Sequence, residues 1–229
     1  MFVRNLKLVI YLPGYAGNFI RFLMSLDDST YPIHLKNTYY DSSIPRKKLY
    51  SYKNLFWKHK NWDAFEQSFI SPLNKPLELF LAQTDYNIAT INLHPGYKHG
   101  RLGYYGFFYE QYKTELGSMN IDYMQVALSA KYKPVIVDFL QNVTKNVWRE
   151  LPLEYEGNLQ DDKEFREKFN PYQINLDMFL LGIDSFVDEY ELLCKHTQLP
   201  AHTDDAIQLY KEWYKVRRFE TLLKEYGLS

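Results

Sequence analysis

The chain has 229 residues, of which 46% are hydrophobic and 17% are aromatic. A chain of this length buries a substantial core, and no linker rich in Pro, Gly or Ser divides it, so we expect a single domain over residues 1–229. Its 27 basic and 28 acidic residues nearly balance, which disfavours a general surface for nucleic acid.

The first predicted element is a strand over Leu8 to Leu12, an apolar, β-branched run without alternation. Such a run is typical of a strand that is buried on both faces of a parallel sheet.

This run is shorter than a signal-peptide core, and no segment approaches the length of a membrane span. The one cysteine, Cys194, lies in an apolar helical pattern that predicts a buried thiol. We therefore expect a cytoplasmic protein with no membrane partner.

The segment that follows this strand predicts a loop and a helix. Apolar residues recur at helical spacing from Phe19 to Leu26, and Asn18 is a candidate N-cap. A helix N-terminus that follows a strand offers free N–H groups to an anion, and glycines let the anion approach the backbone. The candidate anion-binding residues are Gly14, Tyr15, Ala16, Gly17, Asn18 and Phe19. Alternatively, the segment only joins the strand to the helix. It lacks GK[ST], which disfavours a conventional ATPase or GTPase.

The middle of the chain predicts a helical excursion around residues 44–84, with a further helix over Pro76 to Ala82. Six basic residues between positions 46 and 60 face either an anionic substrate or solvent. A second buried strand is expected over Asn87 to Leu93. It ends in His94-Pro95-Gly96, and the glycine-rich segment 96–106 is a candidate mobile lid that carries cationic Lys98 and Arg101.

A third strand is predicted over Tyr123 to Ser129, followed by a helix with Pro134 in its first turn and Ser129 near its cap. Lys131 and Lys133 then lie at the positive end of the helix dipole, where a cation is unfavourable. A bound anion would remove that conflict. Alternatively, both side chains extend into water, where the penalty is screened.

The last third of the chain predicts a surface loop with a short charged helix over Glu154 to Asn170, and then a fourth strand over residues 172–176. A helix over residues 185–199 buries Phe186, Tyr190 and Leu193. A long terminal helix opens at Thr203 and runs to Leu222, with a solvated face formed by Lys211, Lys215, Arg217 and Arg218. Asp122 and Asp177 are interpreted as a turn residue and a helix-start residue.

This order of elements resembles the sulfotransferase family of the P-loop nucleotide-binding fold. The family's first loop typically reads PKSGTT, and here Pro13-Gly14-Tyr15-Ala16-Gly17-Asn18 stands in its place, one residue longer. Its catalytic histidine often lies in a THLP-type motif, which His94 of NLHP matches. Ser129 with Lys131 or Lys133 corresponds to its site for the 3′-phosphate. The resemblance implies a three-layer α/β/α fold with a mostly parallel central sheet.

The resemblance also implies a reaction, the transfer of a sulfonate from 3′-phosphoadenylyl sulfate (PAPS) to a hydroxyl or amine of a small-molecule or glycan acceptor. His94 would be the general base, and Lys98 or Arg101 would close over the leaving oxygen. Alternatively, His94 only caps a strand end. No metal is expected, because the six histidines lack ligand spacing such as HExxH.

Two departures from the family keep other functions open. The loop lysine that would contact the transferred sulfonate is missing, and the family's C-terminal glycine-rich loop is not visible. A non-catalytic protein that keeps the fold and recognises a protein or glycan is the first alternative. An atypical phosphotransferase that uses ATP and magnesium is the second, although no acidic metal site is evident at a strand end.

Overall fold

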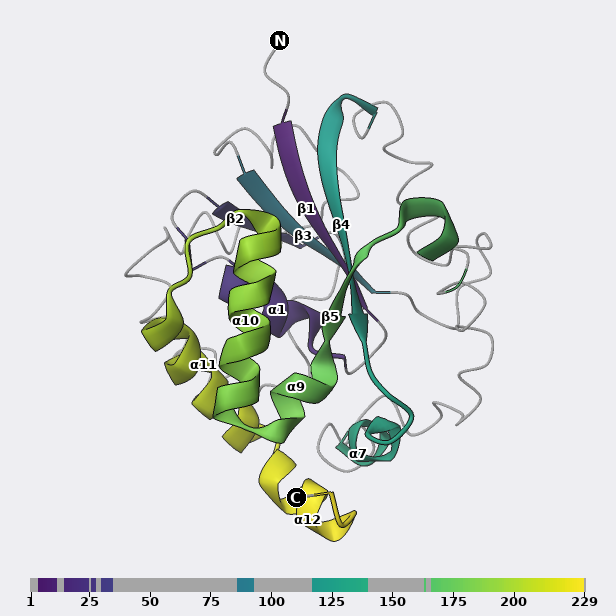
Figure 1. Cartoon of the computed structure of the whole chain (residues 1–229), viewed down its shortest axis with the longest axis vertical. Coiled ribbons are helices and arrows are strands. Elements are labelled where there is room, and N and C mark those ends of the chain that lie inside the picture. Colours follow the sequence, from purple (N-terminus) through teal and green to yellow (C-terminus); the bar gives the residue numbers. More distant parts are fainter. Residues whose placement is uncertain are drawn as a thin grey trace.

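The computed structural model describes residues 4–11, 15–24, 26–27, 30–34, 86–92, 117–139, 163 and 166–228. Within these residues five strands form one sheet in the order β2-β3-β1-β4-β5, and every neighbouring pair is parallel (Figure 1). The strands are β1 (Arg4–Tyr11), β2 (Thr30–His34), β3 (Tyr86–Asn92), β4 (Met119–Ala127) and β5 (Tyr172–Asn175). The predicted α/β class with a parallel central sheet is therefore confirmed.

Six helices are described, and three of them pack together beside the sheet. The six helices are α1 (Gly17–Met24), α7 (Lys133–Asp138), α9 (Leu176–Leu181), α10 (Ile183–Thr197), α11 (Thr203–Val216) and α12 (Phe219–Glu225). Helix α1 contacts β1 and β3, and α10 and α11 pack beside it (Figure 1). These helices form one flanking layer, and the complete three-layer arrangement stays a prediction.

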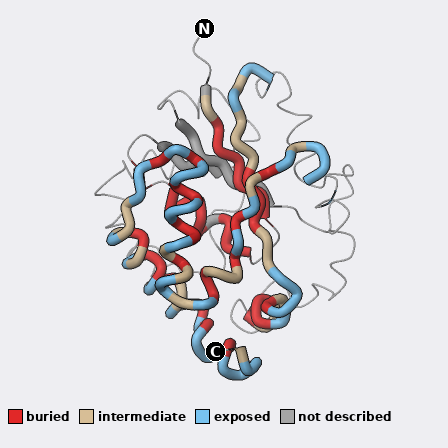
Figure 2. Tube along the Cα trace, in the orientation of Figure 1, coloured by how far each residue is buried: buried red, intermediate tan, exposed pale blue. Residues whose placement is uncertain are grey.

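The central strand β1 is buried on both faces, as its unbroken apolar run predicts. Residues 6–11 are all buried, and Figure 2 shows buried residues concentrated along this strand and on the inner sides of the helices. The buried set includes Lys7, whose ammonium group donates to Asp122 Oδ2 at 3.0 Å and to the Thr197 carbonyl at 2.7 Å. This cation links β1 to β4 and to the C-terminal turn of α10.

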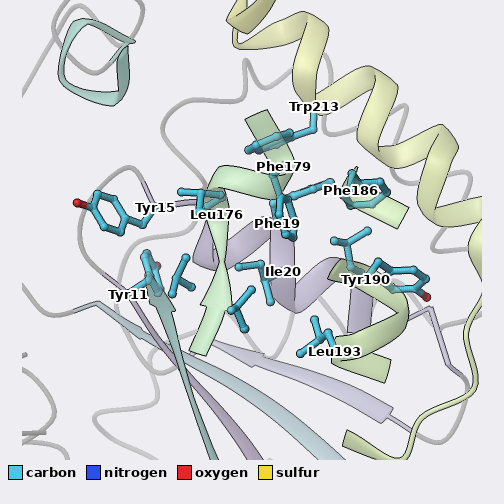
Figure 3. Close-up of a cluster of buried hydrophobic side chains, with 14 of the residues drawn as sticks. Tyr11, Tyr15, Phe19, Ile20, Leu176, Phe179, Phe186, Tyr190, Leu193 and Trp213 are labelled. Carbon is cyan, nitrogen blue, oxygen red and sulfur yellow. The ribbon is translucent and has the colours of Figure 1, made fainter. Parts of the chain in front are cut away.

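An aromatic cluster joins four helices over the sheet (Figure 3). Phe19 of α1 stacks on Trp213 of α11, with ring centroids 4.6 Å apart and planes 7° apart. Phe179 of α9 meets Trp213 edge to face, and Phe186 of α10 meets Phe179 in the same way. The burial predicted for Phe186, Tyr190 and Leu193 is confirmed. The helix layer is thus held by contacts between aromatic rings from separate parts of the chain.

The first helix and the third strand differ from their predicted bounds. Helix α1 begins at Gly17, so Asn18 lies within its first turn and is not its N-cap, and Leu26 lies beyond its last residue. Strand β4 begins at Met119, four residues before the predicted start, because Asn120 to Asp122 extend the pairing with β1. Asp122 is therefore a strand residue and not a turn residue.

The region of Ser129 also differs from its prediction. Helix α7 begins at Lys133 with Tyr132 as its N-cap, so Ser129 lies three residues before the cap. The tight turn that separates them is closed by the Tyr132 N–H, which donates to the Ser129 carbonyl at 3.2 Å. Pro134 in the first turn and the burial of Ile136 and Phe139 agree with the predicted helix.

The predicted long terminal helix is two helices. Arg218 adopts a left-handed backbone conformation with φ of 55°, which ends α11 and begins α12. Arg217 does not belong to a solvated face, since it is only 1% exposed. Its guanidinium carbon lies 4.8 Å from the centroid of the Phe139 ring and 5.1 Å from that of Trp213. Stacking of a planar cation on aromatic rings explains how this charge is buried.

Of the other predicted elements, some are confirmed and some lie outside the described residues. The strands expected over 87–93 and 172–176 are confirmed as β3 and β5, and residues 166–169 of the expected charged helix are helical. Strand β2 and helix α9 were not predicted. The excursion at 44–84, the glycine-rich segment 96–106 and the continuation of the helix beyond Phe139 lie outside the described residues.

Burial of Glu189 on α10 predicts a dependence of stability on pH. Its Oε1 accepts the Asn175 N–H at 2.9 Å, and burial raises the pKa of this carboxyl above its ordinary value, against a smaller opposing effect of the hydrogen bond. A raised pKa in the folded state means that stability is highest when the group is protonated and is lost as pH rises through the folded pKa. We expect Glu189→Gln to be at least as stable as the wild type at pH 7.

Urea unfolding of this variant at several pH values between 4 and 7 checks the prediction. The difference in unfolding free energy between Glu189→Gln and the wild type should grow in favour of the variant as pH rises. Asp188→Asn, which removes the charge of an exposed neighbour on the same helix, is the control. A difference that shrinks with rising pH would show that the ionised carboxylate stabilises the fold.

Candidate functional site

Three adjacent parallel strands, β3, β1 and β4, lead to the predicted site segments. Tyr11 at the end of β1 pairs with Asn92 at the end of β3, and Ile10 pairs with Gln125 of β4. Because the strands are parallel, their carboxyl ends lie at the same edge of the sheet (Figure 1). The first loop leaves β1, the segment with His94 leaves β3, and the segment with Lys131 leaves β4.

This edge is also where the direction of the chain connections changes. From β1 the chain goes to β2, which lies beyond β3 at one end of the strand order. From β4 it goes to β5, which lies at the other end of the strand order. The two connections therefore diverge between β1 and β4. Ligands of open parallel α/β sheets bind at such switch points, outside the carboxyl ends of the strands.

The first loop is closely packed where the structure describes it. Tyr15, Ala16 and Gly17 are buried, and Ala16 adopts a left-handed conformation with φ of 57° while its carbonyl accepts the Ile20 N–H at 3.0 Å. The first turn of α1 carries no acidic residue. Phe19 directs its ring into the aromatic core, so only its backbone is available to a ligand (Figure 3).

Gly17 has a structural role that the sequence did not indicate. A Cβ atom at this position would overlap the ring of Tyr11 at the end of β1. The absence of a side chain therefore lets α1 approach the strand closely, in addition to any use for ligand access. Gly14 lies outside the described residues, so its role as an anion contact stays a prediction.

The turn after β4 contains the second group of candidate residues. Ser129 is exposed, and its backbone N–H donates to Asp177 Oδ1 at 2.9 Å. Lys131 is exposed and Lys133 half-buried, and the Lys131 ammonium lies 5.0 Å from the Tyr132 ring centroid. Neither lysine forms a salt bridge within the described part of the chain. Within the described residues, two cations without a carboxylate partner thus follow the end of β4, one of the two strands that flank the switch point.

The remaining candidates cannot be placed relative to these lysines. His94, Lys98 and Arg101 lie outside the described residues, and only the strand that leads to them is described. His94 follows the last residue of β3, Asn92, by two positions. Their catalytic roles stay predictions.

Sequence reasoning identified Asp177 only as a helix-start residue. That position is confirmed, because Asp177 is the second residue of α9 and its N–H donates to Asn175 Oδ1. Its contact with Ser129 was missed, since the two residues are 48 positions apart. The available signal was that Asn175 and Asp177, an amide and an acid, lie where β5 ends and α9 begins.

Nucleophilic and metal chemistry find little support among the described residues. Burial raises the pKa of the Cys194 thiol to about 11, so the thiolate is scarce at neutral pH. The described ranges contain no group of three or more His, Cys, Asp or Glu side chains arranged to hold a metal ion.

Comparison with known proteins identifies no relative, so the fold class rests on the structure alone. No protein-family model, no curated protein and no solved structure matches this chain. The described residues define an α/β protein with a parallel sheet and flanking helices. None of the helices described is both long enough and apolar enough to cross a membrane.

Proposed function

We propose that the carboxyl edge of the sheet binds a 3′-phosphorylated adenine nucleotide and that the protein is a sulfotransferase that uses PAPS. The adjacency of β3, β1 and β4, each of which leads to one candidate segment, supports this proposal. The segments lie far apart in the sequence, at residues 13–19, 94–101 and 129–133, and adjacent parallel strands lead to all three.

In the proposed site, two loops hold different phosphate groups of the nucleotide. The first turn of α1 offers backbone N–H groups to the 5′-phosphosulfate, since the opening N–H groups of a helix lack intrahelical acceptors. Lys131 and Lys133, together with the Ser129 hydroxyl, hold the 3′-phosphate. The Ser129 backbone N–H is not assigned to the phosphate, because it already donates to Asp177.

The proposed reaction is an in-line displacement at sulfur. The acceptor oxygen or nitrogen forms a bond to sulfur while the bond between sulfur and the bridging phosphate oxygen breaks, which releases 3′-phosphoadenosine 5′-phosphate (PAP). His94 takes the proton that the acceptor loses. Lys98 or Arg101 stabilises the charge that develops on the leaving oxygen, in the role of the missing loop lysine.

Calorimetric titration with PAP tests the nucleotide site, with ADP and with ATP plus magnesium as comparisons. We expect selective binding of PAP that weakens as salt is added, because the 3′-phosphate is held by charge. The variant Lys131→Ala/Lys133→Ala should bind PAP at least about tenfold more weakly, since each charged hydrogen bond is worth more than a neutral one.

A matched control removes two lysines elsewhere. Lys195→Ala/Lys211→Ala changes exposed lysines on α10 and α11 and alters the net charge equally, so its affinity for PAP should match that of the wild type. Absence of PAP binding by the wild type would reject the sulfotransferase site. Equal losses in the two double variants would show a general effect of charge and not a site at the turn.

A non-catalytic recognition protein is the second candidate, and two contacts favour it. The Ser129 N–H is taken by Asp177, and Gly17 is required by the packing of Tyr11, so both loops have structural uses that need no nucleotide. If PAP binds but His94→Ala leaves sulfonate transfer to a panel of hydroxyl and amine acceptors unchanged, His94 has no part in the chemistry. Absence of binding of PAP, ADP and ATP would favour this second function.

A further inference from the structure

Asp177 connects the start of α9 to the turn that carries the two candidate lysines. Strands β4 and β5 end side by side, with Ala127 paired with Asn175, and α9 begins at the next residue. From this position the Asp177 carboxylate accepts the Ser129 N–H at 2.9 Å. A contact between a carboxylate and a backbone amide is a charge-assisted hydrogen bond, which is stronger than a neutral one.

The support beneath Asp177 is rigid. Its own N–H donates to Asn175 Oδ1 at 3.1 Å, and the Asn175 N–H donates to Glu189 on α10. Leu176 and Phe179, on either side of Asp177 in α9, are fully buried. The carboxylate is therefore presented to Ser129 by an element that is anchored in the core.

The turn that donates this hydrogen bond is held at its other end as well. The Tyr132 N–H closes the turn on the Ser129 carbonyl, and the Tyr132 side chain is buried. Lys131 lies inside the turn and Lys133 directly follows it. Fixing Ser129 thus fixes the backbone from which both lysines extend.

We infer that Asp177 is a positioning residue for Lys131 and Lys133 in the binding of the nucleotide 3′-phosphate, an inference that rests on the proposed function. Two effects of Asp177 oppose each other. Its hydrogen bond holds the turn in a binding geometry, whereas its negative charge near the site opposes a phosphate. The net effect depends on which is larger, and two substitutions separate them.

The test compares Asp177→Asn with Asp177→Ala in calorimetric titrations with PAP. Asparagine keeps an oxygen that accepts the Ser129 N–H and removes the charge, whereas alanine removes both. We expect Asp177→Asn to bind PAP at least as tightly as the wild type. Asp177→Ala should bind at least about fivefold more weakly than Asp177→Asn, because the turn is no longer held.

Hydrogen exchange at the Ser129 amide gives a second measurement that needs no nucleotide. Exchange should be faster in Asp177→Ala than in the wild type and close to the wild type in Asp177→Asn. Equal affinities of the two variants for PAP would overturn the inference, whatever the exchange rates. If the wild type itself binds no PAP, the proposed function fails, and the exchange rates still show whether Asp177 holds the turn.

Discussion

Replacing Trp213 with alanine is expected to lower the free energy of unfolding by about 3–5 kcal/mol, the usual cost of truncating a buried tryptophan or phenylalanine. Trp213 is only 1% exposed, stacks on Phe19 of α1 and meets Phe179 of α9. Its ring also lies against the Arg217 guanidinium, with 5.1 Å between the guanidinium carbon and the ring centroid. One truncation therefore removes contacts to two other helices and uncovers part of a buried cation. Urea unfolding measures the loss.

Two further variants show whether the loss comes from packing. Trp213→Phe keeps a ring that can stack on Phe19 and should cost clearly less than alanine. Leu192→Ala, at a position 53% exposed on α10, should change the unfolding free energy by no more than about 0.5 kcal/mol. A loss below about 1 kcal/mol for Trp213→Ala would show that the aromatic cluster does not hold the helix layer together.

The parts of the fold that were predicted are those whose pattern reflects their own burial. Strand β1 lies in the middle of the sheet, so both its faces are apolar and its run stands out in the sequence. Helix α10 has one buried face, and its helical spacing of Phe186, Tyr190 and Leu193 follows from that. In both elements, local pattern and tertiary position agree.

The missed elements are those whose position in the fold overrides a weak local pattern. Strand β2 has five residues with Pro32 among them, and a proline argues against a strand except at a sheet edge, where β2 lies. Arg217 follows a helical pattern as a polar residue, yet it is buried because Phe139 and Trp213 offer it two ring faces. The residues next to Pro32 and Arg217 in the sequence indicate neither the order of the strands nor the position of those rings.

For the candidate site, the strands that lead to the candidate segments were predicted, whereas a contact made by one candidate residue was not. The carboxyl ends of neighbouring parallel strands lie at one edge of the sheet, so the shared edge of β1 and β4 follows once the two strands pair in parallel. The hydrogen bond from Ser129 to Asp177 depends instead on β5 lying next to β4. That adjacency, which no periodicity records, gives the Ser129 backbone N–H a structural role that the sequence did not predict.

Gly17 connects the packing of the fold to the proposed site, and its replacement by alanine should cost about 3 kcal/mol of unfolding free energy, the upper range for overpacking. The added Cβ would overlap the buried ring of Tyr11, which is closely surrounded and must shift. The backbone of Gly17 is not in the left-handed region, so alanine is compatible with its conformation. The predicted cost comes from the clash alone, and urea unfolding measures it.

Removing the ring of Tyr11 should reverse the effect of the Gly17 substitution. In a Tyr11→Ala background, Gly17→Ala should be neutral or stabilise the protein by up to about 1 kcal/mol, because alanine favours a helix over glycine. If the double variant Tyr11→Ala/Gly17→Ala folds as well as Tyr11→Ala but binds PAP more weakly, Gly17 also serves the approach of the ligand to the backbone. Equal affinities would assign Gly17 to packing alone and would leave Lys131 and Lys133 as the described residues that we propose hold the nucleotide.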